Sequence, residues 1–240
     1  MGKKNLVPNE TARLIDKRIE ELRLYTRKTE KDILGLLKDS MELRNHEWEI
    51  WSKDLIIDFY KTSQGVMYCL SKWNLEENYQ VIINYITSIC NKKNGKILDF
   101  AGGIGDLSIS LKENNLDVDF LELQSRTLDF AKWRFKKRDF NLNIYNSLDE
   151  TFSKYDIIIC LDVLETLVNP QEYLKKFYDF LKPDGLLILS VGEIGSKSHP
   201  MNLIENKEFL DNIDKHCQEL GLQESIFENK FHLKIKEKKA

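Results

Sequence analysis

Apolar side chains recur at intervals of three and four through the first ninety residues of this chain, a spacing that predicts amphipathic helices. Pro8 and Asn9 stand near the start of the first helix, and Asn94-Gly95 marks a turn after the last one. Four helices are expected between these points, around residues 14–22, 33–41, 46–60 and 74–90. The chain therefore begins with a helical region.

From Lys96 onward, short apolar runs alternate with amphipathic stretches, which predicts strands and helices built around a parallel sheet. Pro170 opens one expected helix, and Gly221 ends the last long one. Two strands follow, over residues 223–228 and 231–236, with Asn229-Lys230 as the turn between them. The sheet is thus expected to close with an antiparallel hairpin, which is unusual for a dinucleotide-binding fold.

Residues 97–105 carry the most chemical information, because an apolar strand delivers Asp99 to a loop of small residues. Gly102, Gly103 and Gly105 allow backbone amides to approach a ligand closely, where side chains would block it. The stretch that follows starts as a helix, so its free N–H groups and positive dipole end face the loop. This order indicates a nucleotide-binding site; a purely structural turn is the alternative.

Glu122 lies seventeen positions after Gly105, at the end of the next expected strand. An acidic residue at that place can accept hydrogen bonds from both hydroxyl groups of a ribose. Leu123 follows it and is positioned to lie against a flat base. The alternative is a solvated loop carboxylate.

These segments resemble the class I S-adenosylmethionine (SAM) methyltransferases. Residues 99–105 are a form of the Asp-x-Gly-x-Gly-x-Gly motif of that family, and Glu122 matches its ribose-binding acid. Cys160-Leu-Asp-Val-Leu-Glu-Thr-Leu167 resembles its Asp-Val-Leu-Glu-His-Leu segment. Leu181-Lys-Pro-Asp-Gly-Leu-Leu-Ile188 is similar to its Leu-Lys-Pro-Gly-Gly-x-Leu-x-Ile signature. The four motifs occur in the family's order over residues 96–191.

Three positions depart from the family pattern. Ala101 replaces the first glycine, which is expected to be tolerated because the position needs smallness more than a positive φ. Thr166 stands where many relatives carry His, so no role of that His is carried over. The acid that often binds the adenine amine is replaced within Asn146-Ser147-Leu148-Asp149, where either Ser147 or Asp149 is a candidate.

The resemblance implies an α/β fold of the Rossmann-like class I methyltransferase type. It has a seven-stranded, mostly parallel sheet with a C-terminal antiparallel hairpin, and here an N-terminal helical cap over residues 1–91 precedes a SAM-binding domain over 92–240. It assigns SAM, with S-adenosylhomocysteine as product and no metal. The implied SAM-binding residues are Asp99, Ala101, Gly103, Gly105, Glu122, Leu123, Ser147, Leu148, Asp149, Leu161 and Asp162.

The acceptor side is expected to be formed by the cap. Tyr60, Gln64 and Tyr68 are four residues apart and share one face if a helix continues through Gly65. Together with Trp51 they are the candidate substrate-binding residues, although these aromatic side chains could instead pack the interior of the cap. The candidate catalytic residues are His199, which follows the fifth strand, and Tyr68 and His46 of the cap.

Composition narrows the alternatives. A net charge of −3 and a pI near 5.9 argue against nucleic-acid or anionic-membrane partners, and the cations of 132–138 are expected to face water. The four cysteines form no Cys-x-x-Cys pair, no 18-residue apolar stretch is present, and residues 1–7 contain no apolar signal core. A cytoplasmic protein is expected, with a homodimer through the N-terminal helices as a candidate assembly.

The leading functional hypothesis is a SAM-dependent methyltransferase that acts on a small molecule of biosynthetic metabolism. A second hypothesis keeps the SAM site but has the enzyme cyclise SAM itself, with release of methylthioadenosine. A third is a SAM-binding module without catalysis.

Overall fold

The computed structural model describes residues 8–239, so the first seven residues of the expected cap lie outside the described part of the chain. Seven strands form one sheet in the order β3-β2-β1-β4-β5-β7-β6. The five strands from β3 to β5 run parallel, and β7 is antiparallel to both β5 and β6. The strands are β1 (Lys96–Phe100), β2 (Asp117–Leu121), β3 (Ile144–Tyr145), β4 (Tyr155–Leu161), β5 (Leu181–Ser190), β6 (Leu222–Glu224) and β7 (Lys234–Lys238). This sheet confirms the predicted fold.

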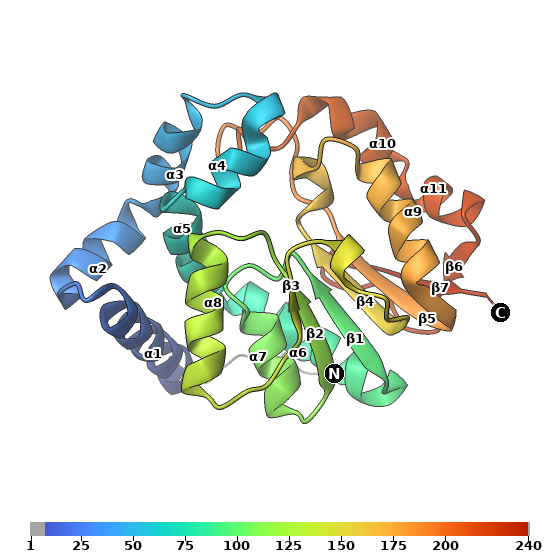
Figure 1. Cartoon of the computed structure of the whole chain (residues 1–240), viewed down its shortest axis with the longest axis horizontal. Helices are drawn as coiled ribbons and strands as arrows, with labels where there is room; N and C mark the ends of the chain where they lie inside the picture. Colours follow the sequence, from blue (N-terminus) through green and yellow to red (C-terminus); the bar gives the residue numbers. More distant parts are fainter. Residues whose placement is uncertain (1–7, 240) are drawn as a thin grey trace.

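Helices cover both faces of the sheet (Figure 1). Because side chains alternate along a strand, Ile157 and Ile159 of β4 pack with the apolar sides of α6 (Glu77–Lys93) and α7 (Asp106–Glu113). Ile158 and Cys160 pack on the opposite side with α9 (Pro170–Phe180) and α11 (Ile213–Glu219). The first face continues to α8 (Arg126–Lys137), and the second face also has α10 (Lys207–Asp211).

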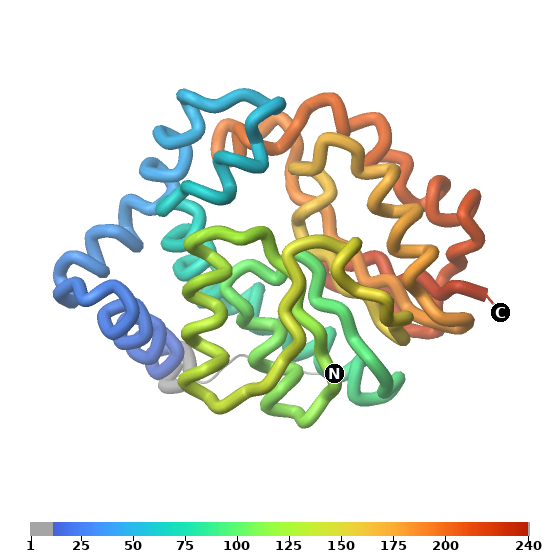
Figure 2. Tube along the Cα trace, viewed as in Figure 1, coloured from blue at the N-terminus to red at the C-terminus, as the bar shows by residue number. Residues whose placement is uncertain are grey.

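The remaining helices form the cap, which Figure 2 shows as the blue to blue-green part of the trace. They are α1 (Pro8–Thr26), α2 (Glu30–Lys38), α3 (Ser40–Trp48), the short η1 (Lys53–Leu55), α4 (Ile56–Thr62) and α5 (Gly65–Trp73). Residues of α1, α2 and α5 share an apolar cluster with Ile104 of the glycine loop and Phe130 of α8. A second cluster joins Phe59 and Val66 of the cap to Met201, which follows β5. The cap therefore contacts the loops at the carboxyl ends of two strands.

The helical periodicity of the first ninety residues is confirmed, but the single helix predicted from His46 to Tyr60 is wrong. Helix α3 ends at Trp48, and α4 starts at Ile56. Trp48 and Trp51 flank a turn, in which the Trp51 N–H donates to the Trp48 carbonyl at 2.9 Å. Both side chains pack against the cluster around Phe59, so the apolar spacing continues through the break between the helices. The apolar spacing over residues 46–60 therefore reflects side chains that share one core, although they do not lie on one continuous helix.

The C-terminal hairpin is present, but its predicted two-residue turn is wrong. Nine residues, 225–233, connect β6 to β7. Phe227 and Leu233 of this connection pack against the core beneath α6, and Asn229 accepts a hydrogen bond from the Ile235 N–H at 2.9 Å. The apolar residues that indicated strand ends belong instead to a packed loop.

Within residues 8–239, no helix has the length and apolar character needed to cross a membrane.

Candidate active site

The glycine loop connects β1 to α7 at the carboxyl edge of the sheet. Gly105 has φ +81°, and a Cβ atom there would lie 2.6 Å from the Phe135 ring of α8. A Cβ at Gly102 would lie 2.4 Å from the Phe120 ring and 2.7 Å from Oδ2 of Asp99. A side chain at Gly102 or Gly105 would therefore clash with β2 or α8, and the loop can adopt this shape only with glycine at both positions.

Ala101 has φ +53°, in the left-handed region, so the expectation that this position does not need a positive φ is wrong. A left-handed conformation costs an L-residue with a Cβ roughly 1–2 kcal/mol. The loop therefore holds Ala101 in a strained conformation at the end of β1, and surrounding contacts must stabilise it.

Glu122 directly follows β2 and lies beside this loop. Its two carboxylate oxygens accept hydrogen bonds from the Gly103 and Leu123 N–H groups, both at 2.8 Å. Burial raises the pKa of Glu122 to about 7, although these two N–H groups favour the charged form. The glycine loop therefore donates a hydrogen bond directly to Glu122, the acid predicted to bind ribose.

Asp99 lies beneath the loop and is only 3% exposed. Its Oδ2 accepts a hydrogen bond from the Ser108 hydroxyl of α7 at 2.6 Å. Burial raises its pKa to about 6, against the effect of Ser108. Asp99 therefore supports the loop from below as well as lying near the predicted cofactor site.

The predicted adenine side brings Leu123 near the end of β3. Asp149 is a poor candidate for reading the base, because its largely exposed carboxylate pairs with Lys176 at 3.4 Å. Ser147 is half-buried, and Leu148 is buried against the apolar core. Oδ1 of Asn146 is buried and has no hydrogen-bond partner among the described residues, so an unsatisfied acceptor lies next to Ser147.

The carboxyl end of β4 brings together residues that the sequence placed far apart. Leu161 ends the strand, and Asp162 follows it with φ +52° and accepts a hydrogen bond from the Ser190 hydroxyl at 2.7 Å. Burial raises the pKa of Asp162, and the hydrogen bond from Ser190 opposes that effect. His199 is half-buried, and its ring meets the edge of Trp73 at a centroid distance of 6.3 Å. Burial and then the Arg44 guanidinium lower the pKa of His199, so its imidazole is neutral at pH 7.

The predicted shared face of Tyr60, Gln64 and Tyr68 is wrong. The helix stops at Thr62 because Ser63 is extended (ψ 129°), and a new helix begins at Gly65. Tyr68 is 2% exposed and packs with the α1–α2–α8 cluster, where burial raises its pKa and Arg126 opposes that effect. Gln64 is exposed. Of the three, Tyr60 is the one that lies near the motif after β4: burial raises its pKa, and the neighbouring Glu165 raises it further.

The other two cap candidates have different surroundings. Trp51 is half-buried at the edge of the cluster formed by Phe59, Val66 and Met201. The imidazole of His46 is 82% exposed and pairs with Glu49 on its own helix at 3.1 Å. The structure does not bring His46 to the site.

Glu165 was missed as a candidate, although it stands within the Cys160–Leu167 motif. It is 2% exposed; its Oε1 accepts the Gly192 N–H at 3.0 Å, and its Oε2 has no partner in the described chain. Burial, and then the charge of Asp162, raise the pKa of Glu165 to about 8. The available signal was a second acidic residue, besides Asp162, within a largely apolar motif.

Comparison with known proteins decides the family. Residues 74–224 match the family model described as a methyltransferase domain, which is more than half of the chain. The chain belongs to this methyltransferase family. The resemblance inferred from the four motifs is confirmed, and the protein is a SAM-dependent methyltransferase.

Curated relatives and solved structures agree with this assignment. The methyltransferase is 26% identical over 181 residues to a ubiquinone biosynthesis O-methyltransferase of Rickettsia canadensis, covering 74% of this chain and 72% of the relative. The corresponding protein of Rickettsia felis is 24% identical, over 75% and 70%. Magnesium protoporphyrin IX methyltransferase from Synechocystis, solved with bound SAM, is similar in fold with a TM-score of 0.57 at 18% identity, over 77% of this chain and 95% of that one.

SAM fits the residues present. Glu122 offers carboxylate oxygens at a strand end, where ribose hydroxyls can donate to them. The unsatisfied Oδ1 of Asn146 offers an acceptor at the adenine side, where an exocyclic amine can donate. At Gly103 a Cβ would come within 3.1 Å of Leu70 of the cap, so a side chain there would narrow the space between loop and cap.

Proposed function

We propose that this methyltransferase transfers the methyl group of SAM to a hydroxyl group of a small aromatic acceptor. The observation that carries the proposal is the position of His199, a half-buried neutral imidazole that packs against the ring of Trp73 and is influenced by Asp162. A neutral imidazole can take the proton that a hydroxyl must lose when its oxygen is methylated. The O-methyltransferase names of the curated relatives support oxygen as the acceptor atom.

The proposed roles divide between the two sides of the site. SAM, when bound, supplies a methyl group on a sulfonium sulfur, so the chemistry needs neither a metal nor a covalent enzyme intermediate. Glu122 holds the ribose, Leu123 and Leu148 contact the adenine, and Ser147 with Asn146 reads its edge. Leu161 and Asp162 border the acceptor, and the chain's main contribution is positioning.

Aromatic residues of the cap supply the acceptor side of the proposed site. Trp73 is 44% exposed beside His199, so a planar ring can stack near the imidazole. Tyr60 lies near Thr166 and Glu165, and both Tyr60 and Glu165 are neutral at pH 7. A neutral Glu165 offers a donor O–H to a polar group on the acceptor. The proposed acceptor is therefore an uncharged or anionic hydroxyarene.

The test uses methyl-labelled SAM with catechol as the probe acceptor, and with 1,2-dimethoxybenzene as a matched control that lacks a free hydroxyl group. We expect label in the catechol product together with S-adenosylhomocysteine, and neither with the control. Release of methylthioadenosine from SAM alone would contradict methyl transfer and support cyclisation of SAM. Labelling of amines or thiols in place of phenols would contradict oxygen as the acceptor atom.

A further inference from the structure

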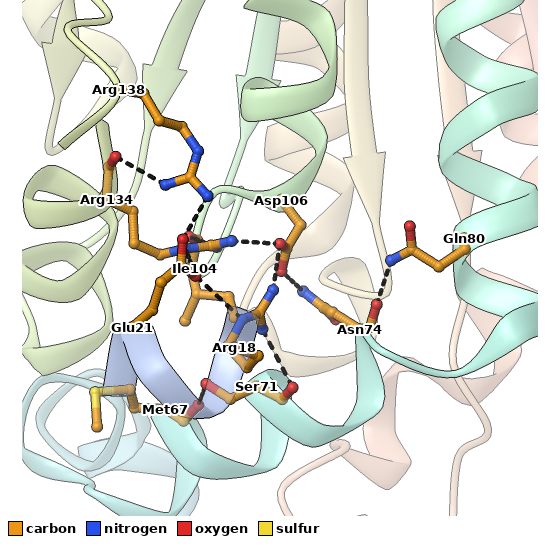
Figure 3. A network of polar contacts seen from close by, with 10 residues as sticks. All are labelled: Arg18, Glu21, Met67, Ser71, Asn74, Gln80, Ile104, Asp106, Arg134 and Arg138. Carbon is orange, nitrogen blue, oxygen red and sulfur yellow. Dashed lines mark hydrogen bonds and ion pairs between the residues drawn. The ribbon is translucent and has the colours of Figure 1, made fainter. Parts of the chain in front are cut away.

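A largely buried group of charged residues lies beside Ile104 of the glycine loop (Figure 3). Arg18 and Glu21 come from α1, and Asp106 is the first residue of α7. Arg134 comes from α8, and Arg138 directly follows that helix. We call these five residues the arginine cluster. Arg134 and Arg18 are 3% and 4% exposed, so the prediction that the cations of 132–138 all face water is wrong at Arg134.

Asp106 is the centre of the arginine cluster. Its Oδ1 accepts hydrogen bonds from Nη2 of Arg18 at 2.5 Å and from Nη2 of Arg134 at 2.7 Å, and its Oδ2 accepts one from Asn74 at 2.8 Å. Burial alone would raise the pKa of Asp106, but the charges of Arg134 and Arg18 outweigh it and lower that pKa to about 2. The carboxylate therefore stays charged at every physiological pH.

Arg134 also binds the loop itself. Its Nη1 donates to the Ile104 carbonyl at 2.6 Å, so one guanidinium holds the residues on both sides of Gly105. Its Nε donates to Glu21 of α1 at 3.0 Å, and Arg138 donates to the other oxygen of Glu21. Arg18 donates a further hydrogen bond to the Ser71 carbonyl of α5 at 3.2 Å. Arg18 of α1 thus bonds Asp106, the residue that follows the glycine loop, and also links it to α5 through the Ser71 carbonyl.

Stability alone is a weak explanation for such a group. Removing charges from water costs free energy, and buried ion pairs contribute little net stability compared with apolar residues of similar volume. The paired N–H groups of a guanidinium do, however, fix the position and orientation of the groups that accept their hydrogen bonds. The loop it holds contains three glycines, which have large conformational freedom when unrestrained, and Ala101, which is strained.

We propose that the arginine cluster is a positioning device for the cofactor, through which α1 fixes the glycine loop in the conformation that binds SAM. The loop is ordered before SAM arrives, so the entropy of ordering it does not reduce the affinity. Arg18 thereby acts on SAM binding through Asp106 without contacting SAM. The inference depends on the proposed placement of SAM at this loop.

The experiment compares SAM affinity with stability in the full-length chain. Arg18→Met removes the charge and both hydrogen bonds while keeping an unbranched apolar stem. Arg18→Lys keeps the charge with a single donor group. Arg23→Met is the matched control, because Arg23 lies on the same helix, is 43% exposed and, among the described residues, forms an ion pair with Glu20 alone, at 2.7 Å. SAM binding is measured by calorimetry, stability by urea unfolding, and loop order by hydrogen exchange of the amides of residues 103–109.

For Arg18→Met we expect SAM to bind about tenfold more weakly, with faster exchange in residues 103–109. Arg18→Lys should show an intermediate loss of about threefold, and Arg23→Met no change. A folded Arg18→Met variant whose SAM affinity lies within twofold of the parent would overturn the proposal. Should that variant not fold, parental affinity in Arg18→Lys would overturn it instead.

Glu122→Ala, measured in the same assay, separates a failure of the positioning role of Arg18 from a failure of the proposed SAM site. Weakened binding in Glu122→Ala together with unchanged binding in the Arg18 variants would refute the positioning role alone. Unchanged binding in all of them would remove the glycine loop as the cofactor site.

Discussion

At the scale of single residues, Glu122 determines how the cofactor site responds to substitution and pH. Glu122→Ala should weaken SAM binding by about 1–3 kcal/mol, because a charged hydrogen-bond partner is lost while the fold is retained. The carboxylate form accepts from ribose hydroxyls, and the pKa of Glu122 in the free enzyme is about 7. SAM affinity should therefore rise about tenfold between pH 6 and pH 8 as the carboxyl group loses its proton.

Calorimetry at several pH values tests this expectation, with Glu122→Gln as the control that cannot titrate. Asp99 has a raised pKa of about 6 and remains in that variant, so a small residual pH dependence is expected. Unchanged affinity in a folded Glu122→Ala variant would exclude this residue as the ribose ligand.

His199 is proposed to accept the proton of the acceptor hydroxyl group and to have no part in binding SAM. His199→Gln should lower the rate of methyl transfer to catechol by about 10²–10⁴-fold, the usual contribution of a positioned base, with SAM affinity unchanged. The pKa of His199 is lowered from its ordinary 6.5, and the neutral form is the active one. The rate should therefore rise with pH through a midpoint below 6.5 and then stay level, as measured from the pH profile of kcat/KM for catechol at saturating SAM. An equal loss of SAM affinity would assign His199 a binding role instead.

At the scale of elements, α5 changes the expectation for Tyr68. The sequence suggested a phenol directed at the ligand, but Tyr68 lies in the cluster that joins α5 to α1, α2 and α8. Tyr68→Ala should lower the free energy of unfolding by about 3–5 kcal/mol, because a large buried ring is removed. Tyr68→Phe should retain both stability and turnover. A loss of turnover without loss of stability in Tyr68→Phe would restore a catalytic role for the phenol.

The strands and loops of the cofactor half were predictable because their motifs are local. Asp99, the glycines and Glu122 lie within 24 consecutive residues, and the strand–loop–helix unit determines how they meet. The acceptor half was not predictable to the same degree. His199 meets Trp73 and is influenced by Arg44, residues that lie far away in the sequence and come together only through packing of the cap. The role of Arg134 could not be predicted from the sequence either, because a cationic side chain on an amphipathic helix usually faces water.

At the scale of the whole molecule, the division into cap and core remains a prediction that deletions can test. The boundary expected at residue 91 would remove α6, whose Ile83, Ile86 and Ile89 pack in the core beneath the sheet. The family match instead begins at residue 74. We therefore expect deletion of residues 1–91 to prevent folding. Deletion of residues 1–73 should leave a folded core that binds SAM poorly and is inactive.

Circular dichroism and calorimetry distinguish these outcomes, with the full chain as reference. Full SAM affinity in the core that lacks residues 1–73 would contradict the role given to the cap. A homodimer through the N-terminal helices likewise stays a prediction, which sedimentation of the full chain at several concentrations can test.

The arginine cluster also affects the order in which the chain can assemble during synthesis. Glu21 leaves the ribosome 113 residues before its partner Arg134. At 5–20 residues per second, α1 waits about 6–23 seconds before its docking site exists. Helices in proteins draw most of their stability from tertiary packing, so α1 can make its full set of native contacts only after α8 has been made. Helix α1 is therefore synthesised well before it can reach its native position.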